Sequence, residues 1–559
     1  MDFESLNLTV SDVRFLPLVS AFVKKIGIVD EVNRLCPSEA DVSCGHVVTA
    51  LILDTLSGRS PLYRLEDSFG GSDLELLLGV DIPSSKLNDD AVGRVLDRLW
   101  ETGTGKILTA VALGAVKKFS LDTRRVHHDT TSLTVYGDYD LYSDPDHGQP
   151  MVITYGFNKD HRPDLKQLVQ SLLCVDHGIP IWSTWEDGNE SDKTINKKLM
   201  GRIVEKMREL GQDDPLYVAD SALVTRDNLS MMSDEQKGFR FVTRFPASYG
   251  ECERAIQRAV KADGWEDLGV LADGASGSKK HQPAHYHGFE TKVTLYGRQY
   301  RAVVVHSTAH DARKTKKLTR LFADDLAELK KVKVQQEKIE YACLPDARAA
   351  LSRMAPGRFH RLEGEVEEIL RYGRGRPKVD GSRCVNGLSY RLRLRIERME
   401  ERITMAEREA GCFVLLTNVP REGENALGSR ELLEAYKAQD SVERNFGFLK
   451  DDAIVNSLFL KSPARIEALG LILVLSLLIW RLMERTMRVF LKNNGKTITG
   501  WEKRQTSRPT SLMMTNRFTS VIVIRSPSGR FLGNPLNTVQ LQYLQALGLS
   551  PEVFTKPCA

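Results

Sequence analysis

The chain has 559 residues, of which 42% are hydrophobic and 27% are charged, and its formal net charge at pH 7 is +4. This length predicts roughly two to four domains, and the composition excludes a disordered chain. Because opposite charges nearly balance, the chain as a whole offers no basic field for nucleic acid, and any such signal must be local. The eight cysteines include no Cys-x-x-Cys pair, which argues against a disulfide framework or a cysteine zinc site and favours a cytoplasmic protein.

Residues 1–118 predict a small all-helical domain. The first residues, MDFESLNLTVSDV, lack the basic and apolar regions of a signal peptide. Apolar residues recur at helical spacing in FLPLVSAFVKKIGIVDEVNRL and CGHVVTALILDTLS, and capping residues open SSKLNDDAVGRVLDRLW. The domain is a candidate for DNA binding, although its sequence singles out no recognition helix.

Residues 119–246 change to short β-branched runs, which predict a mixed α/β sheet with helices packed on it. A run of strands comes first, followed by helix, strand, helix and strand. The two helices are SDKTINKKLMGRIVEKMREL, capped by Ser191, and ALVTRDNLSMM. The predicted strands are RRVHHDTTSLTVYG, PMVITYGFNKD, LKQLVQSLLCVDHG, IPIWSTWEDGN, DPLYVAD and GFRFVTRFP.

Residues 247–410 predict an insertion that interrupts this sheet. It contains a strand, YRAVVVHST, and two long charged helices, TKKLTRLFADDLAELKKVKVQQEKIEY and YRLRLRIERMEERITMAEREA. In residues 411–490, GCFVLLTNVP predicts a return to a buried strand. The 13 residues of ALGLILVLSLLIW are too few for a membrane span and predict a buried helix. Residues 491–559 form a C-terminal region with weak signals and no recognisable motif.

The stretch YKAQDSVERNFGFLK predicts an amphipathic helix with an unusual polar stripe. Tyr436, Glu443 and Lys450 are spaced by seven residues, which is nearly two helical turns. Gln439 lies between the first two, so an aromatic hydroxyl, an amide, a carboxylate and an ammonium follow one line beside an apolar stripe.

Two aspartates follow predicted strands at the place where α/β sheets tend to hold their chemistry. Asp129 ends the first strand, and Asp220 ends PLYVAD. Together with Glu443 they form a set of carboxylates that would repel one another unless a cation lay among them. Hard oxygen ligands favour Mg²⁺ or Mn²⁺. Composition alone does not select these three from 74 acidic residues, and each aspartate could instead cap a strand end or a turn.

With these residues in place, the chain resembles the DDE transposases of bacterial insertion sequences, in the group with a Y-x2-R-x3-E-x6-K signature. The signature reads Tyr436, Gln439, Glu443 and Lys450. The resemblance covers about residues 120–245 and 410–485, and the helical N-terminal domain resembles one that precedes the core in related transposases. The supporting motifs, in the family's order, are HHDTTS, YGFNKDHRPDLKQL, GNESDKT, YVADSAL, FVTRFP and SVERNFGFLK.

The resemblance implies an RNase H-like catalytic core split by an insertion domain. Asp129, Asp220 and Glu443 would be the catalytic, metal-binding triad for Mg²⁺, with Mn²⁺ as a substitute. Two such ions stabilise the attacking and leaving oxygens of a phosphoryl displacement. The implied reaction is cut-and-paste transposition, in which a homodimer cleaves double-stranded DNA at terminal inverted repeats and transfers the ends into target DNA. Some relatives pass through a DNA hairpin, and no membrane is involved.

The same resemblance gives the remaining polar residues a role in binding DNA phosphates. Tyr436 and Lys450 would hold a phosphate near the scissile bond, although Lys450 could also be a solvated helix end. Gln439 stands where the signature has Arg. A glutamine can donate a hydrogen bond but has neither the charge nor the bidentate fork of arginine, which bears on the phosphate contact and on the hairpin route.

Further basic residues are predicted DNA contacts. Lys159, Arg162 and Arg244 lie in the family-like motifs, where the alternative is a surface position or a structural salt bridge. RYGRGRPKV resembles an AT-hook core, so Arg374 and Arg376 are predicted to enter a minor groove.

A histidine cluster stays open as a metal site. HQPAHYH has a spacing that could bind a metal, but the sequence shows no cysteine or carboxylate partner for it.

Two rival functions also stay open. The first rival function is an RNase H-like DNA nuclease without strand transfer. The second is a catalytically inactive DNA-binding scaffold, against which the presence of all three acids argues.

Overall fold

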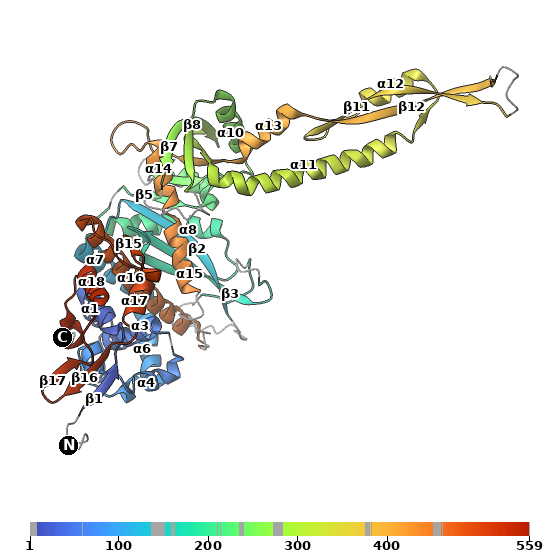
Figure 1. The fold of residues 1–559 in the computed structure, drawn as a ribbon. Coiled ribbons are helices and arrows are strands. Elements are labelled where there is room, and N and C mark those ends of the chain that lie inside the picture. Colours follow the sequence, from blue (N-terminus) through green and yellow to red (C-terminus); the bar gives the residue numbers. More distant parts are fainter. Residues whose placement is uncertain are drawn as a thin grey trace. The chain divides into compact units, whose positions relative to one another are not determined.

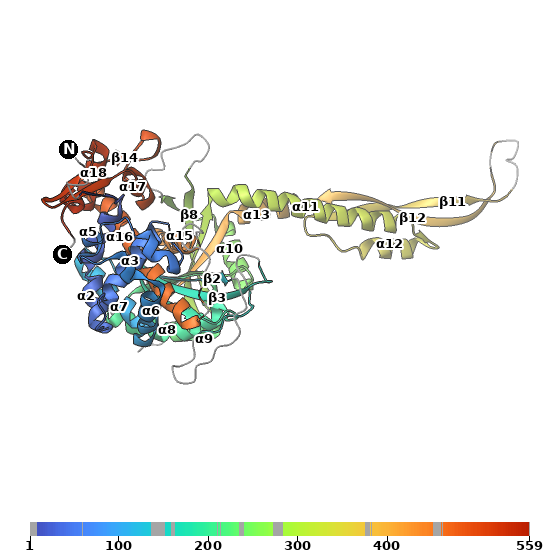
Figure 2. The same cartoon turned by 90° about the horizontal axis from the view of Figure 1, so that it is seen from below.

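The computed structural model divides the chain into two compact units, drawn from two directions in Figures 1 and 2. Unit 1 contains residues 1–243 and 435–559, and unit 2 contains residues 244–434. The finer five-part division stays a prediction. The structure describes residues 8–58, 60–135, 151–157, 162–209, 211–212, 214–233, 240–271, 283–374, 381, 383–450, 460 and 462–557.

A mixed sheet with the strand order β4-β3-β2-β5-β6 carries the chemistry-bearing motifs of unit 1. Its first three members are antiparallel, whereas β5 and β6 run parallel to β2. The predicted mixed α/β class is confirmed, because helices connect β4 to β5 and β5 to β6. These elements are β2 (Arg125–Val135), β3 (Lys166–Val175), β4 (Ile179–Glu186), α8 (Asp192–Glu209), β5 (Leu216–Ala219), α9 (Arg226–Met232) and β6 (Phe241–Arg244).

The predicted strand PMVITYGFNKD is wrong for the residues that the structure describes, 151–157. They make one isolated bridge, between Thr154 and Gln167, instead of a ladder. The motif glycines explain the close approach of this segment to its neighbour. A Cβ on Gly156 would lie 2.1 Å from the carbonyl oxygen of Gly188, so neither backbone leaves room for a side chain at this contact.

A long apolar helix, α16 (Pro463–Asn494), passes among the N-terminal helices of unit 1, as Figure 2 shows. Its length and mean hydropathy of 2.1 would suit a membrane span, but 83% of its most apolar window is buried inside the protein. It packs on α3, α6 and α7 and on strand β4, where Gly470 touches the ring of Trp185. The predicted buried helix is therefore confirmed, and it is longer than its apolar stretch.

The N-terminal helices share their core with the C-terminal region. Phe22, Phe518 and Phe554 belong to one buried cluster. A short strand, β1, pairs with β16, so the prediction of an all-helical N-terminal domain is wrong; the partner strand lies near the other end of the chain, where no local pattern could reveal it. The N-terminal elements are β1 (Thr9–Asp12), α1 (Leu16–Ile26), α2 (Ile28–Leu35), α3 (Cys44–Leu56), α4 (Leu65–Ser68), α5 (Leu74–Leu78), α6 (Asp89–Thr102) and α7 (Thr104–Phe119).

The C-terminal elements add a small sheet and an ion pair to this core. Arg530 of β17 donates to both carboxylate oxygens of Asp73 in the N-terminal region, at 2.7 and 3.0 Å. Both side chains are buried, so the two ends of the chain are tied together by charge as well as by packing. The elements are β14 (Ile498–Thr499), β15 (Gln505–Thr506), α17 (Ser511–Arg517), β16 (Ile522–Ser526), β17 (Gly529–Leu532) and α18 (Thr538–Leu547).

Unit 2 combines strands in the order β13-β9-β8-β7 with a three-stranded sheet in the order β10-β12-β11, in which the antiparallel pair β11–β12 is the longest. Helix α11 runs alongside that pair in Figures 1 and 2. The elements are α10 (Gly250–Ala262), β7 (Glu266–Val270), β8 (His285–Leu295), β9 (Arg298–Ser307), α11 (Thr308–Gln336), β10 (Glu340–Tyr341), α12 (Leu344–Ser352), β11 (His360–Tyr372), β12 (Val385–Arg398), α13 (Glu400–Ala410) and β13 (Cys412–Thr417).

The second long helix predicted in this region is wrong over its first half. YRLRLRIER belongs to strand β12, and only the residues from Glu400 onward form a helix, α13. The physical reason is a period of two: Leu392 and Leu394 are buried against Ala347, while the alternating Arg393 and Arg395 are exposed.

Candidate active site

Asp129 and Asp220 lie side by side on neighbouring parallel strands. His127 of β2 pairs with Val218 of β5, and each aspartate follows its strand partner by two residues. The two aspartates are therefore at the same level and on the same face of the sheet, on backbones about 4.8 Å apart. Both side chains are half-buried.

Local hydrogen bonds fix the backbone around both aspartates. Asp220 caps the turn Ser221–Leu223 by accepting a hydrogen bond from the Ala222 amide at 3.0 Å. The Thr243 hydroxyl of β6 donates to the Asp220 carbonyl at 2.6 Å. One Asp129 carboxylate oxygen accepts from the Thr130 amide at 2.8 Å. The turn cap considered from the sequence is therefore present at Asp220, which follows β5. The prediction that Asp129 ends its strand is wrong, because Asp129 lies in the middle of β2, whose ladder with β3 continues to Val135.

The helix with Glu443 covers the face that carries the two aspartates. Cys174 of β3 pairs with His127, and paired residues share a face, so Cys174 lies on the aspartate side. Asn445 of α15 (Asp440–Leu449) donates to the Cys174 sulfur at 3.4 Å. Glu443 is on the same helix and its side chain is exposed, so the helix that carries the third predicted carboxylate lies on the aspartate face.

Asn445 is a buried hub that holds this helix in place. Its amide donates to the carbonyl of Gly178, in the β3–β4 turn, at 2.7 Å, and its oxygen accepts from Arg481 of α16 at 2.7 Å. Gly178 has a φ of +92°, and a Cβ there would lie 2.8 Å from the Cβ of Ser441. The sequence analysis missed Asn445, although it lies within the SVERNFGFLK motif.

Negative charge gathers around the aspartates. Burial, followed by the charges of Asp220 and Asp129, raises the pKa of the Tyr217 hydroxyl. Burial raises the pKa of the Cys174 thiol to about 12; the hydrogen bond from Asn445 and the charge of Arg481 oppose this shift, and the charge of Asp129 adds to it. The pKa values of two groups on opposite faces of the sheet are thus raised in part by the same carboxylates, and a negative field of this kind attracts a cation.

The predicted continuous helix around Tyr436 is two helices. α14 (Ser429–Lys437) ends before a turn at residues 438–439, and α15 begins at Asp440. Gln439 lies at this break, is buried, and donates to the His128 carbonyl at 3.4 Å. The junction is therefore attached to β2 next to Asp129, and the polar stripe crosses a turn.

The predicted DNA contacts have different surroundings. Tyr436 near the end of α14 and Lys450 at the end of α15 are half-buried. Arg162 pairs with Asp164 at 2.7 Å. In unit 2, the exposed Arg244 lies over the ring of Phe413 at 5.6 Å, and the exposed Arg374 follows β11. The remaining two lie outside the described residues: Lys159 and Arg376.

Asp129 and Asp220 lie at one level of the sheet and the helix of Glu443 packs on the same face, but the three carboxylates do not form a compact cage. In the part of the chain that the structure describes, the trio of acidic, histidine or cysteine side chains with all ligand atoms within 4.8 Å of one another is Asp267, His285 and His287. Asp129, Asp220 and Glu443 are described and do not meet that separation.

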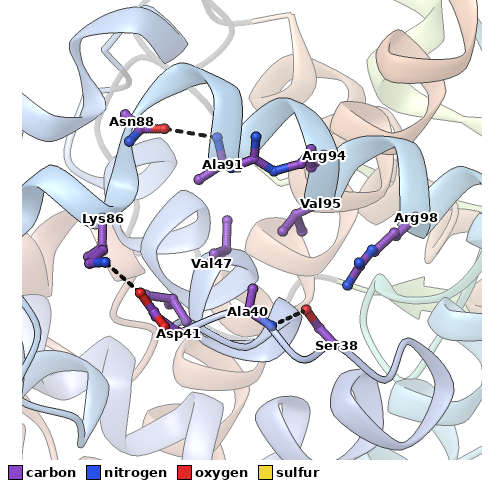
Figure 3. Close-up of a pocket in the computed structure, with 11 residues that line it drawn as sticks. Ser38, Ala40, Asp41, Val47, Lys86, Asn88, Ala91, Arg94, Val95 and Arg98 are labelled. Carbon is purple, nitrogen blue, oxygen red and sulfur yellow. Dashed lines mark hydrogen bonds and ion pairs between the residues drawn. The ribbon is translucent and has the colours of Figure 1, made fainter.

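A basic pocket of about 240 Å³ opens between α6 and the segment before α3 (Figure 3). Arg94 and Arg98 are exposed, are one helical turn apart on α6, and line the pocket. Neither forms an ion pair with any residue that the structure describes, whereas Lys86 in the same pocket pairs with Asp41 at 2.5 Å. The sequence analysis did not single out these arginines, and their spacing of four was the available signal.

Comparison with known proteins gives matches of different kinds. Residues 8–113 match a family model described as a domain of unknown function, DUF4277. No curated protein sequence matches the chain. The cryo-EM structure of a piggyBac transposase synaptic complex with hairpin DNA is similar with a TM-score of 0.36 and 9% identity, over 90% of this chain and 80% of that chain. The Mos1 transposase paired-end complex with the left transposon end gives 0.14 and 15%, over 33% and 55%.

Proposed function

We propose that the chain is a DDE transposase of an insertion sequence, with an RNase H-like core in unit 1 that an insertion domain interrupts. The observation that carries the proposal is that Asp129 and Asp220 lie side by side and that the helix with Glu443 packs on the face they share. Each of these residues lies in a motif of the Y-x2-R-x3-E-x6-K group, and the fold brings the three motifs to one side of the sheet. The order of three antiparallel strands followed by two parallel strands supports the RNase H-like interpretation.

Asp129, Asp220 and Glu443 would hold Mg²⁺, or Mn²⁺ in its place. The donor set fits these hard cations, because all three ligands are carboxylates and two lie half-buried at one level of the sheet. When bound, a pair of ions supplies charge stabilisation to the attacking and leaving oxygens of phosphoryl transfer. Two metal ions about 3.5–4 Å apart are held by ligands that spread over a larger distance than the ligands of a single ion. The ligand atoms of the three carboxylates do not all lie within 4.8 Å of one another, which agrees with such a site.

DNA is the substrate in this proposal, as double-stranded terminal inverted repeats and target DNA. Tyr436 and Lys450 lie on either side of Glu443 and would bind backbone phosphates near the scissile bond. Gln439 is better suited to positioning, because it is buried and its amide is directed to the His128 carbonyl. The exposed Arg244 and Arg374 and the half-exposed Arg162 stay candidates for backbone contacts.

The pocket of the N-terminal region supplies a further phosphate-binding surface. Arg94 and Arg98 carry guanidinium groups that no described acid neutralises, and one turn of helix brings them to the same side of α6. Planar guanidinium groups bind phosphate oxygens in pairs. We therefore assign a DNA-backbone contact to this part of the proposed DNA-binding domain.

The test is cleavage of a labelled duplex that carries the ends of the element from which the gene comes, in Mg²⁺ and in Mn²⁺. Asp129→Asn, Asp220→Asn and Glu443→Gln are expected to bind the ends and to leave them uncut. Asp227→Asn is the matched control, because Asp227 is an exposed acid of unit 1 paired only with Lys197 among its described ion partners. A hairpin-sized product on a denaturing gel would establish the hairpin route.

Three results would count against the proposal. Full cleavage by any variant of the trio would remove that residue from the site. Cleavage without joining of precut ends to target DNA would favour a nuclease, and binding without cleavage by the unmodified chain would favour a DNA-binding scaffold.

A synaptic homodimer is expected as a complex of two chains with two ends in size-exclusion chromatography with light scattering.

A further inference from the structure

Two imidazoles and a carboxylate meet on one face of the β7–β8 ribbon in unit 2. The ligand atoms of Asp267, His285 and His287 all lie within 4.8 Å of one another. His285 and His287 are two residues apart on β8 and share a face, and Asp267 pairs directly with His287. The carboxylate partner that the HQPAHYH motif lacks in sequence is thus supplied by the preceding strand.

A β-bulge aims the aspartate into this cluster. The register of β7 shifts between Asp267 and Gly269, so buried Leu268 is the extra residue. Gly269 has a φ of +68°, which favours glycine, and its amide donates to the Asp267 carboxylate at 2.7 Å. Bulges re-aim side chains at such positions. The orientation of Asp267 is therefore built into the backbone.

The distances within the cluster suit a coordinated ion. His285 Nε2 lies 3.4 Å from an Asp267 carboxylate oxygen, and the two histidine rings are 4.9 Å apart at 44°. Imidazole nitrogens with a carboxylate favour Zn²⁺ and related transition metals over Mg²⁺. His306 of β9 pairs with His287, so it faces the same side, with its ring 6.3 Å from that of His287.

We propose that Asp267, His285 and His287 form a binding site for a divalent transition-metal cation of the Zn²⁺ class. The ion would tie β7, the end strand of its sheet order, to β8. Three protein ligands leave one tetrahedral position for water or for His306. This site is chemically distinct from the proposed carboxylate trio of unit 1, which has no nitrogen ligand.

The test is calorimetric titration of Zn²⁺ into the full, untagged chain at pH 7.5, after chelator treatment and in excess Mg²⁺. Excess Mg²⁺ occupies sites made of carboxylates alone, so it separates the two kinds of site. The expected result is one Zn²⁺ per chain, with complete loss of binding in the double variant His285→Gln, His287→Gln. Glu266→Gln is the matched control, because Glu266 neighbours Asp267 on β7 but alternates to the opposite face.

Hydrogen exchange gives a second measurement, the effect of Zn²⁺ on amide exchange. Loss of a surface contact alone would not abolish this effect. Zn²⁺ is expected to slow amide exchange in residues 266–270 of the unmodified chain and of Glu266→Gln, and to have no effect on the double variant. Absence of Zn²⁺ binding by the unmodified chain would overturn the proposal. Undiminished binding by the double variant, while its exchange without Zn²⁺ matches the unmodified chain, would overturn it as well.

Discussion

Replacing Asn445 with alanine tests whether the buried hub holds the helix of Glu443 on the sheet. The change removes the partner of the Gly178 carbonyl and the acceptor of Arg481, and both partners are buried or nearly so. A buried polar group left without a hydrogen bond costs about 1–3 kcal/mol, so two such groups cost at least about 2 kcal/mol. At about 1.4 kcal/mol for each factor of ten, this corresponds to about 30-fold more frequent opening of the helix.

Hydrogen–deuterium exchange of the peptide that contains Asp440–Leu449 measures that opening directly. Asn445→Ala is expected to exchange about 30-fold faster or more in this peptide and to lose cleavage activity with it. Asn516→Ala is the matched control, because Asn516 is exposed and, among the residues that the structure describes, its side chain donates only to the carbonyl of Leu512 in its own helix. Exchange in Asn445→Ala within threefold of the unmodified chain would refute the hub as the anchor of α15.

Three further changes test packing, charge and DNA binding. Gly470→Ala places a Cβ 2.2 Å from the indole of Trp185 on β4, and this overpacking should cost about 1–3 kcal/mol of stability and lower the melting temperature. Gly201→Ala is the control, because its Cβ meets nothing within 4 Å and should not lower the melting temperature. Burial raises the pKa of Asp73 but hydrogen bonds from the β17 arginine outweigh it, so the net pKa is below 3.8. The stabilisation by the Asp73 carboxylate is fully present at pH values above its ordinary pKa, and it is lost as the pH falls through the lower pKa of the folded state. The melting temperatures of Asp73→Asn and of the unmodified chain should therefore converge in acid. Arg94→Gln with Arg98→Gln should weaken DNA binding for all sequences and reduce the slope of log K against log salt by about 1.8.

The local pattern of the sequence predicts the strands that carry the carboxylates. β2 is a run of 11 residues rich in β-branched and apolar side chains, and β5 is a short apolar run followed by Asp220, which caps a turn. The pairing of β2 with β5 is a contact between distant segments, which single-sequence patterns do not encode. The sequence therefore placed Asp220 correctly after its strand and Asp129 wrongly at the end of a strand that continues to Val135. The common level and face of the two aspartates came from the register.

Other elements escaped prediction for identifiable physical reasons. In β12, alternate arginines and leucines satisfy a strand with one outward face, but the same charged residues are also good helix formers. The break after α14 has no glycine or proline to announce it, because it is held by a tertiary bond from Gln439 to the His128 carbonyl. Asp267 and the histidines come together only through pairing of β7 with β8, across a bulge.

The break at Gln439 changes what the signature spacing means. On one straight helix, seven residues between Tyr436 and Glu443 would place both side chains along one line by helical repeat alone. Here a turn separates them, so their relative placement depends on how the junction is attached to β2. An arginine at position 439 would have to bury its charge or leave this position and reorient the turn. Gln439, which is neutral and buried, instead fixes the junction next to Asp129 through its hydrogen bond to the His128 carbonyl.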